Sequence, residues 1–282
     1  MAIAGAAPRR VLIKVGGETV RDAVDRVRLA KDIAQVVGTG ADVVIVHGAG
    51  PQITKLGERL GLQSTFRSGR RVTDAAMLQT VAMAMCGEVG PQVLAALLAQ
   101  GVRALATPAA SAGIAVGRKR PPKRLQGELE PVDFGLVADI DRIDATVLCA
   151  LWQARLVPVL SSLVADTEGQ LLNLNADALT TALVTALHVD DVVLVTGVAG
   201  VFADIADPST HLAELKASDL AGLLASGAIA GGMIAKLEEV AAILRHGARR
   251  VFIVGFRDDQ AITGAILGRP GLRTVIAADG VS

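Results

Sequence analysis

The sequence predicts an α/β protein built around a buried and largely parallel β-sheet. The 282 residues are 51% hydrophobic, and the mean hydropathy of +0.49 reflects short runs of Ala, Val and Leu. These runs have the length of strands and alternate with helix-like segments, which is the pattern of a sheet buried beneath helices. A chain of this length can form one large domain or two lobes around a sizeable core.

The composition argues against several classes of partner. Lys plus Arg and Asp plus Glu each number 28, so the formal net charge is +0, and aromatic residues make up 2% with no Tyr. Nucleic-acid binders carry basic surfaces and aromatic side chains that stack on bases, so we expect no nucleic-acid partner. No apolar run reaches the roughly 18 uninterrupted residues of a membrane span, and Met1–Arg10 lacks the apolar core of a secretory signal. We therefore expect a cytoplasmic protein without a membrane partner, in which Cys86 and Cys149 are buried free thiols.

The chain opens with a predicted β-α-β unit. Val11–Val15 is an apolar run of strand type, Arg21–Val37 has helical spacing, and Ala41–Val46 is a second apolar run. This order predicts two parallel strands joined by a right-handed crossover. Gly16 and Gly17 follow the first strand at once, and glycines at that position let backbone N–H groups turn toward a phosphate.

The second strand runs into another glycine turn, His47–Gln52, which contains Gly48 and Gly50. Backbone N–H groups at the start of the following helix can hold an anion. Lys14, near the end of the first strand, adds a mobile positive charge. One glycine turn is a weak signal, but two of them at the ends of consecutive parallel strands favour an anion site. We interpret His47 as a residue that packs to orient this loop rather than as a base.

A polar segment and a run of further elements follow. The segment 63–74 contains three arginines, Arg67, Arg70 and Arg71. Thr73 or Asp74 is suited to cap a predicted helix over Ala75–Met85, and an arginine just before a capped helix can bind a substrate carboxylate. Gly117–Lys123 is basic and proline-bearing and is predicted to be an exposed connection. The remaining helices and strands of this region are predicted at Val93–Leu98, Ala104–Ala106, Asp133–Ile140, Thr146–Arg155 (with Trp152 in the core) and Val157–Val164.

Two later clusters also lie at the ends of strands or the starts of helices. Asn173–Asp177 places three amide or carboxylate side chains between an apolar pair and the helix-like run Ala178–Leu187, where open α/β folds place ligand chemistry. Val192–Val195 is a predicted strand that runs into Thr196–Val201, and Leu215–Ser226 is predicted to be helical. Another helix starts near Gly231-Gly232 and carries Lys236 on its first turns.

The order of these motifs carries a resemblance. K-x-G-G, H-G-A-G-P, R-V-T-D, N-x-N-A-D and G-G-M-I-x-K occur in that sequence, and from Val11 to Ala277 the chain resembles the amino-acid kinase family. Within the family it is similar to the branch that phosphorylates the γ-carboxylate of N-acetyl-L-glutamate with ATP and Mg²⁺, the second step of arginine biosynthesis. The resemblance implies a three-layer α/β/α sandwich with a mainly parallel sheet. It also implies an N-terminal lobe at 1–185 for the acyl amino acid and dimerisation, and a C-terminal lobe at 186–282 for ATP.

The resemblance also implies roles for individual residues. Lys14 and Lys236 match lysines that stabilise the transition state, and Asp177 matches an aspartate that holds them in place. The implied substrate contacts are Ala49 and Gly50 (backbone), Arg71 and Asn173, and the implied nucleotide contacts are Gly16, Gly17, Thr196, Gly197, Gly200, Val201 and Gly232. No protein ligand for a metal is implied. The chemistry is consistent with these parts, because a carboxylate is already deprotonated at pH 7 and its phosphorylation needs positioning and positive charge rather than a base.

Several departures from the family pattern leave alternatives open. Ala49 replaces a common glycine, Gly197 stands where many relatives have aspartate, and Ala235 replaces the usual proline. One alternative is a kinase of carrier-protein-linked aminoadipate or glutamate in lysine biosynthesis, for which the basic stretch Arg118–Arg124 could dock an acidic carrier. A second alternative is a regulatory homologue without catalysis. Because only about ten residues precede the first strand, where arginine-inhibited hexameric relatives have an extra helix, we expect an arginine-insensitive homodimer.

Overall fold

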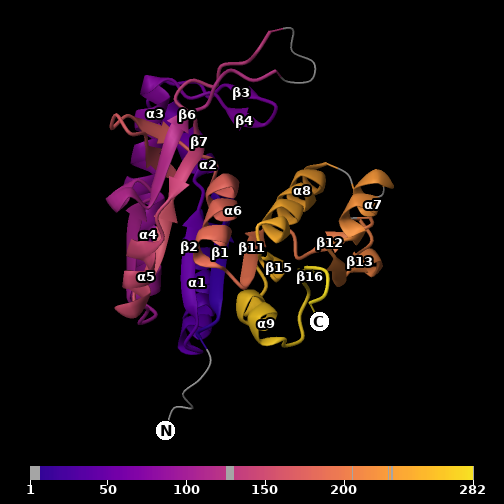
Figure 1. The fold of residues 1–282 in the computed structure, drawn as a ribbon. Helices are drawn as coiled ribbons and strands as arrows, with labels where there is room; N and C mark the ends of the chain where they lie inside the picture. Colours follow the sequence, from indigo (N-terminus) through magenta and orange to yellow (C-terminus); the bar gives the residue numbers. More distant parts are fainter. Residues whose placement is uncertain (1–6, 125–129, 205, 228, 230, 282) are drawn as a thin grey trace.

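The computed structural model describes residues 7–124, 130–204, 206–227, 229 and 231–281. Residues 1–6, which belong to the segment Met1–Arg10 where no secretory signal is expected, lie outside the described residues. An eight-stranded sheet has the order β14-β16-β15-β11-β1-β2-β8-β5 (Figure 1). Every neighbouring pair in it is parallel except β15 and β16. Its strands are β1 (Arg10–Val15), β2 (Asp42–His47), β5 (Ala104–Pro108), β8 (Val157–Ser161), β11 (Asp191–Thr196), β14 (Glu214–Lys216), β15 (Arg250–Gly255) and β16 (Thr274–Ala277).

Helices cover both faces of this sheet. Side chains along β1 point alternately to the two faces, and each face has its own apolar core. Val11, Ile13 and Val15 belong to one core, and Leu12 belongs to the other. The first core is completed by α1 (Ala23–Gly38), α2 (Gly50–Arg59), α3 (Ala75–Ala82), the π-helix η2 (Met83–Val89), α4 (Gly90–Leu98) and α9 (Ala261–Leu267). The second is completed by α5 (Thr146–Gln153), α6 (Ala176–Leu187), α7 (Asp219–Ala225) and α8 (Gly232–Arg245). The predicted three-layer α/β/α sandwich is confirmed.

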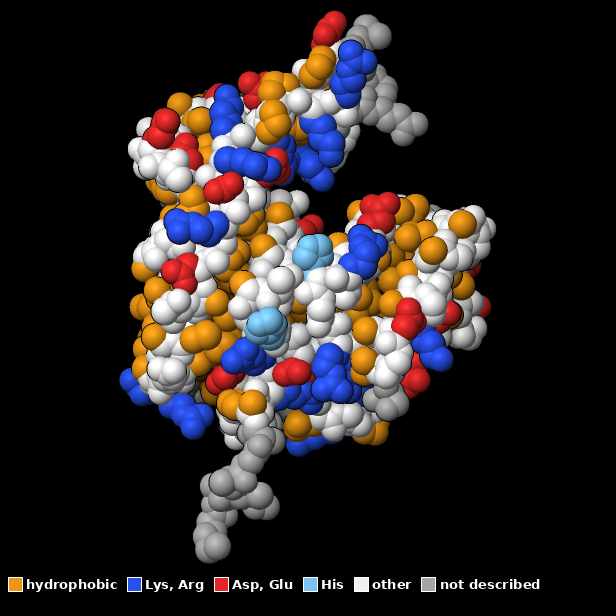
Figure 2. All heavy atoms as spheres, viewed as in Figure 1, with side chains coloured by type: hydrophobic (Ala, Val, Ile, Leu, Met, Phe, Trp, Pro, Cys, Tyr) orange, Lys and Arg blue, Asp and Glu red, His pale blue; other side chains and the backbone are white. Residues whose placement is uncertain are grey.

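Smaller sheets stand beside the central one. A four-stranded sheet has the order β10-β9-β6-β7, and two hairpins pair β3 with β4 and β12 with β13. Their bounds are β3 (Phe66–Arg67), β4 (Arg70–Arg71), β6 (Ala115–Lys119), β7 (Ala138–Ile143), β9 (Leu163–Ala165), β10 (Leu171–Asn173), β12 (Val201–Phe202) and β13 (His211–Leu212). Figure 2 shows a notch in the molecular surface beneath the part that carries the β3–β4 hairpin, and α8 borders the other side.

The predicted helices and strands differ from the observed ones at several places. The strand expected at Val157–Val164 divides into β8 and β9, which belong to different sheets, and the connection expected at Gly117–Lys123 begins within β6. The helices expected at Ala75–Met85 and Val93–Leu98 form one continuous run, because the π-turn η2 carries the helix across the interval. The strand expected at Asp133–Ile140 starts only at Ala138, and the first residues of the helix expected at Leu215–Ser226 belong to β14. Short apolar runs do not distinguish strand from helix, and pairing with β16 decides the last case.

The run Ala75–Leu98 is long and apolar enough by length and composition to cross a membrane. It contacts α1, α2 and β5 as a covering helix of the sheet. The expected burial of both cysteines is wrong: Cys86 is exposed and Cys149 is half-buried. Cys86 lies within η2, where the wider turn changes which side chains face the core. Trp152 is buried as predicted, and its indole N–H donates to the Val43 carbonyl at 2.8 Å.

The expected boundary between lobes, after residue 185, falls inside α6. The central sheet crosses it, since β1 pairs with β11 on the far side of the boundary. The division into two lobes stays a prediction.

Candidate active site

The carboxyl ends of β1, β2 and β11 meet at one edge of the sheet, as parallel neighbours must. Lys14 lies in β1 between Val46 of β2 and Leu194 of β11. The amino ends of α6 and α8 carry Asp177 and Lys236 at the same edge. The structure therefore brings together the three residues expected to be catalytic, which are separated by more than 200 positions at the extremes.

Lys14 is held by two carboxylates. Its Nζ forms an ion pair with Asp177 and another with Glu239, whose Oε1 is 2.6 Å away. The Lys14 and Glu239 side chains are 15% and 8% exposed, whereas Asp177 is 45% exposed. Burial lowers the pKa of Lys14, but attraction to Glu239 and Asp177 outweighs it, so the pKa is raised above its ordinary value. Lys14 is a firmly charged ammonium at the end of β1.

Lys236 behaves differently although it belongs to the same cluster. Burial is the first cause that lowers its pKa, and repulsion from Lys14 is the second. Glu239, Asp177 and Glu18 attract the proton without restoring the ordinary pKa. The charge of Lys14 is therefore close enough to lower the pKa of Lys236.

The turn before α6 explains how Asp177 is placed. Asn175 is the N-cap residue of α6, and its side chain accepts a hydrogen bond from the Asp177 N–H at 2.8 Å. Asp177 thus lies in the first turn, where its negative charge is also favoured by the helix dipole. Asn173 ends β10, and its side-chain amide donates to Thr73 Oγ1 at 3.1 Å. This contact ties the N-x-N-A-D motif to the R-V-T-D motif.

The two predicted glycine turns pack against each other. The Gln52 side chain donates to the Gly17 carbonyl at 2.8 Å, and the Gly48 N–H donates to the Val15 carbonyl at 3.0 Å. A Cβ at Gly17 would lie 2.8 Å from Gln52 Oε1 and 3.0 Å from the Ala49 Cα. Glycine is required at position 17 because the turns approach so closely.

Arg71 lies beside the second glycine turn. Its guanidinium donates to the Gly50 carbonyl at 3.2 Å and to Thr54 Oγ1 at 2.9 Å, contacts Ser64, and stands 4.7 Å over the Phe66 ring. Of the two residues expected to cap α3, Thr73 and Asp74, the cap is Asp74, whose side chain accepts a hydrogen bond from the Met77 N–H at 2.8 Å. Arg71 is therefore fixed on the hairpin side of the notch, close to Ala49 and Gly50.

His47 is buried, with 1% of its surface exposed. Burial lowers its pKa to about 4, so the ring is neutral at physiological pH. It lies against a small cavity lined by Cys86, Gly90 and Ser161 rather than at the charged cluster. This placement is consistent with the interpretation of His47 as a packing residue.

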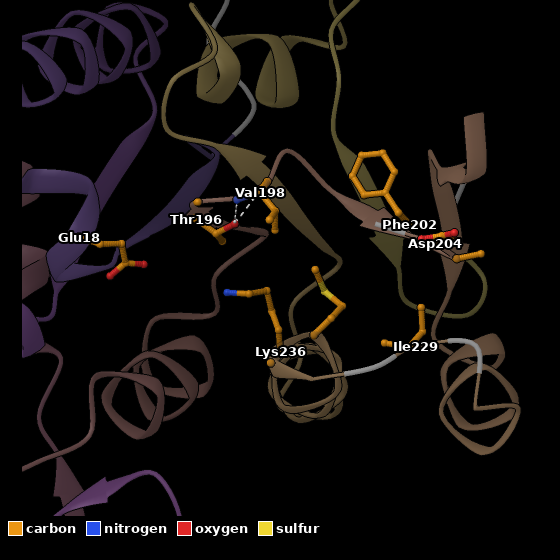
Figure 3. Close-up of a pocket in the computed structure, with 11 residues that line it drawn as sticks. Glu18, Thr196, Val198, Phe202, Asp204, Ile229 and Lys236 are labelled. Atoms are coloured by element: carbon orange, nitrogen blue, oxygen red, sulfur yellow. Dashed lines mark hydrogen bonds between the residues drawn. The ribbon is translucent and has the colours of Figure 1, made fainter. Parts of the chain in front are cut away.

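Lys236 also lines a large cavity of about 780 Å³ (Figure 3). The Lys236 amine points into it, toward the side where Thr196 and Glu18 lie. Its lining combines these polar groups and two glycines with an apolar set, and consists of Glu18, Thr196, Gly197, Val198, Phe202, Ala203, Asp204, Ile229, Gly232, Met233 and Lys236. A cavity of this size and mixed lining can hold a nucleotide-sized ligand.

The seven expected nucleotide contacts separate into groups. Thr196, Gly197 and Gly232 line the cavity, while Gly16 and Gly17 lie at the charged cluster beside it. Gly200 and Val201 do not line the cavity. Val201 is buried and its N–H donates to Thr274 Oγ1 at 2.8 Å, and a Cβ at Gly200 would lie 2.7 Å from His211 Nε2.

Sequence reasoning missed Glu239, Glu18 and the apolar part of the cavity. Glu239 follows Lys236 by three positions on α8, so its spacing placed it on the same face of the helix. Glu18 follows the first glycine pair directly. Phe202 lies on β12, whereas Ile229 precedes α8 and Met233 lies on its first turn, and the fold brings Phe202 to the other two.

Within the described ranges, no group of three or more His, Cys, Asp or Glu residues is placed to hold a metal ion. Mg²⁺ commonly keeps several waters and is bound by one or two carboxylates plus the phosphates of a substrate. Glu18 and Asp204 are the carboxylates that line the cavity. This arrangement fits a metal that is delivered with a nucleotide, and it does not fit a cage made only of protein ligands.

The chain also resembles known proteins in sequence and in fold. The chain is 39% identical over 270 residues to the acetylglutamate kinase of Anaeromyxobacter dehalogenans (strain 2CP-C), covering 95% of this chain and 99% of that enzyme. The fold matches N-acetylglutamate synthase from Neisseria gonorrhoeae with a TM-score of 0.80 at 22% identity, over 95% of this chain and 59% of that one. It matches Giardia carbamate kinase with a TM-score of 0.69 at 17% identity, over 97% and 100%. The sequence pattern of the amino acid kinase family matches residues 9–255, and the chain belongs to that family.

Proposed function

We propose that this protein phosphorylates the γ-carboxylate of N-acetyl-L-glutamate with ATP, giving N-acetyl-L-glutamyl 5-phosphate and ADP in arginine biosynthesis. The observation that carries the proposal is the cluster of Lys14, Lys236 and Asp177 between the glycine turns and the large cavity. Relatives that are 39% identical over nearly the whole chain are acetylglutamate kinases, which supports this substrate.

The reaction joins two anions. A carboxylate oxygen attacks the γ-phosphorus, the bond between that phosphorus and the β,γ-bridging oxygen breaks, and ADP leaves with the electron pair. Charge repulsion opposes the approach, and two positioned ammonium groups and backbone N–H donors offset it. Lys14 and Lys236 would supply the positive charge, and Asp177 would keep Lys14 in place.

ATP would occupy the cavity lined by Thr196, Gly197 and Gly232, with its phosphates toward Lys236. The apolar side chains Phe202, Ile229 and Met233 are suited to contact a base. Mg²⁺ bound with the nucleotide supplies further positive charge to the transferred phosphoryl group. Glu18, the lining carboxylate on the side toward which the Lys236 amine points, would contact its water shell.

The acyl amino acid would bind on the opposite side of Lys14. Arg71 beside the Gly50 carbonyl is suited to a substrate carboxylate, and the Ala49 and Gly50 N–H groups begin α2. The Asn173 side chain, at the end of β10, completes this side. Nucleotide and amino acid would thus meet at the two lysines.

The decisive experiment is a hydroxamate assay, in which hydroxylamine traps the acyl phosphate made from ATP and N-acetyl-L-glutamate. Parallel reactions contain free glutamate or a carrier-linked glutamate or aminoadipate. We expect turnover on the acetylated substrate, with loss in the absence of Mg²⁺. Turnover restricted to the carrier-linked substrate, or the absence of turnover on every acceptor, would refute the proposed substrate.

A homodimer in the cytoplasm is part of the proposal. β5 is an edge strand of the large sheet, and the exposed apolar side chains Leu98 and Leu105 lie on α4 and β5. An edge strand flanked by exposed apolar groups is suited to pair with a second copy. Light scattering after size exclusion should give twice the chain mass, and Leu105→Glu should shift it toward the monomer.

A further inference from the structure

Glu239 is a buried carboxylate at the reaction centre that no sequence motif singled out. It lies on α8 three residues after Lys236, and its Oε1 is 2.6 Å from Lys14 Nζ. With 8% of its side chain exposed, it is the least accessible charged group of the cluster. A buried carboxylate this close to an ammonium restricts that ammonium strongly.

The two carboxylates that hold Lys14 are not equivalent. Asp177 is 45% exposed, so water and salt weaken its attraction for Lys14. Glu239 is shielded from water and lies on α8. The firmer contact of Lys14 is therefore made by Glu239, and it ties β1 to the helix that carries Lys236.

We propose that Glu239 is a positioning residue that fixes the Lys14 ammonium beside Lys236 at the site of phosphoryl transfer. The inference rests on the proposed function and extends it. Glu239 would act through Lys14, because it contacts the lysine and does not belong to the lining of the nucleotide-sized cavity.

The charges that face this contact come from four elements. Lys14 is on β1, Glu18 on η1 (Gly17–Val20), Asp177 on α6, and Lys236 with Glu239 on α8. Removing the charge of Glu239 makes the cluster one unit more positive. Both lysines then bind their protons less tightly, and Lys14 keeps only the exposed Asp177 as a partner.

Glu239→Gln tests the proposal, because glutamine has nearly the same shape without the charge. Glu238→Gln is the matched control, since Glu238 is its exposed neighbour on the same helix. Acetylation by acetic anhydride across a pH series, read for each lysine by mass spectrometry, reports when Lys14 and Lys236 lose their protons, with exposed Lys55 as the internal reference. We expect Glu239→Gln to move the Lys14 curve to lower pH by about one unit or more, and Glu238→Gln to leave it in place.

Kinetics supply the second readout. We expect kcat of Glu239→Gln to fall by about tenfold, since a misplaced group slows transfer, while the KM for ATP does not rise because a negative charge near the phosphates has been removed. If Glu239→Gln does not fold, Glu239→Asp keeps the charge on a shorter arm, and it should lower kcat while moving the Lys14 curve less.

Equal lysine titration curves in the two glutamine variants, or a displaced curve with unchanged kcat, would overturn the proposal. The acetylation experiment needs no substrate. If the wild-type protein failed to use acetylglutamate, the proposed function would fail, while the hold of Glu239 on Lys14 would still be measured.

Discussion

Replacing Lys236 with methionine is the sharpest test of the candidate active site. Methionine keeps an unbranched side chain of similar length and removes the charge that points into the cavity. Lys14 cannot take over, because two carboxylates already hold it at the end of β1. The loss of one electrostatic donor to a transition state costs roughly 10²–10³ in kcat, which corresponds to about 3–4 kcal/mol. We expect a loss of that size in Lys236→Met.

The hydroxamate assay measures this effect directly, with Lys55→Met as a control at an exposed lysine. The pH profile gives a second signature. Since burial and Lys14 lower the pKa of Lys236, wild-type activity should decline as the pH rises through a value below 10.5. Lys236→Met should lose this alkaline limb together with most of its rate. A variant that retained kcat within about threefold of the wild type would refute the assignment of Lys236 to the transition state.

Three further changes test the surrounding structure. Gly17→Ala should lower the free energy of unfolding by about 1–3 kcal/mol and reduce activity, because its Cβ would press on Gln52. Gly38 has open space around it, so Gly38→Ala should change neither the thermal unfolding nor the activity. Arg71→Lys should raise the KM for acetylglutamate by about 10-fold or more with little change in the KM for ATP; equal increases in both would show that Arg71 does not contact the acyl amino acid. Burial lowers the pKa of His47 in the folded protein to about 4, below its value in the unfolded chain. The contribution of neutral His47 to the free energy of unfolding is therefore complete above about pH 6.5, and up to about 3 kcal/mol is lost as the pH falls toward 4. His47→Gln should flatten that dependence in denaturant unfolding, and an unchanged slope would contradict the burial argument.

The parts of the site that the sequence predicts are those whose geometry is local. Gly16 and Gly17 follow a strand, the polar run Asn173–Asp177 leads into α6, and Asp74 caps α3. In each case a few neighbouring residues determine the backbone and leave a distinctive sequence pattern. The parallel direction of β1 and β2 then follows from β-α-β connectivity, which brings their carboxyl ends together.

The parts that the sequence misses depend on packing between distant segments. Glu239 looks like any polar residue on a helix surface until β1 places Lys14 against it. The π-turn within Met83–Val89 leaves no clear signal in composition, and it exposes Cys86 against expectation. Gly200 likewise fits a strand-end nucleotide motif, but its close approach to His211 and Thr274 explains the glycine without a ligand.

The two lysines of the candidate active site differ in how their surroundings stabilise their charge. Lys14 is compensated by Glu239 and Asp177, which raise its pKa, so its charge is maintained before any substrate binds. Lys236 is left with a lowered pKa, because burial and the neighbouring Lys14 disfavour its proton. An anionic phosphate that entered the cavity beside Lys236 would raise the pKa of Lys236 and keep its ammonium charged. In the proposed reaction, Lys14 would thus be charged before substrate binds, and the charge of Lys236 would be stabilised by the phosphates of the nucleotide.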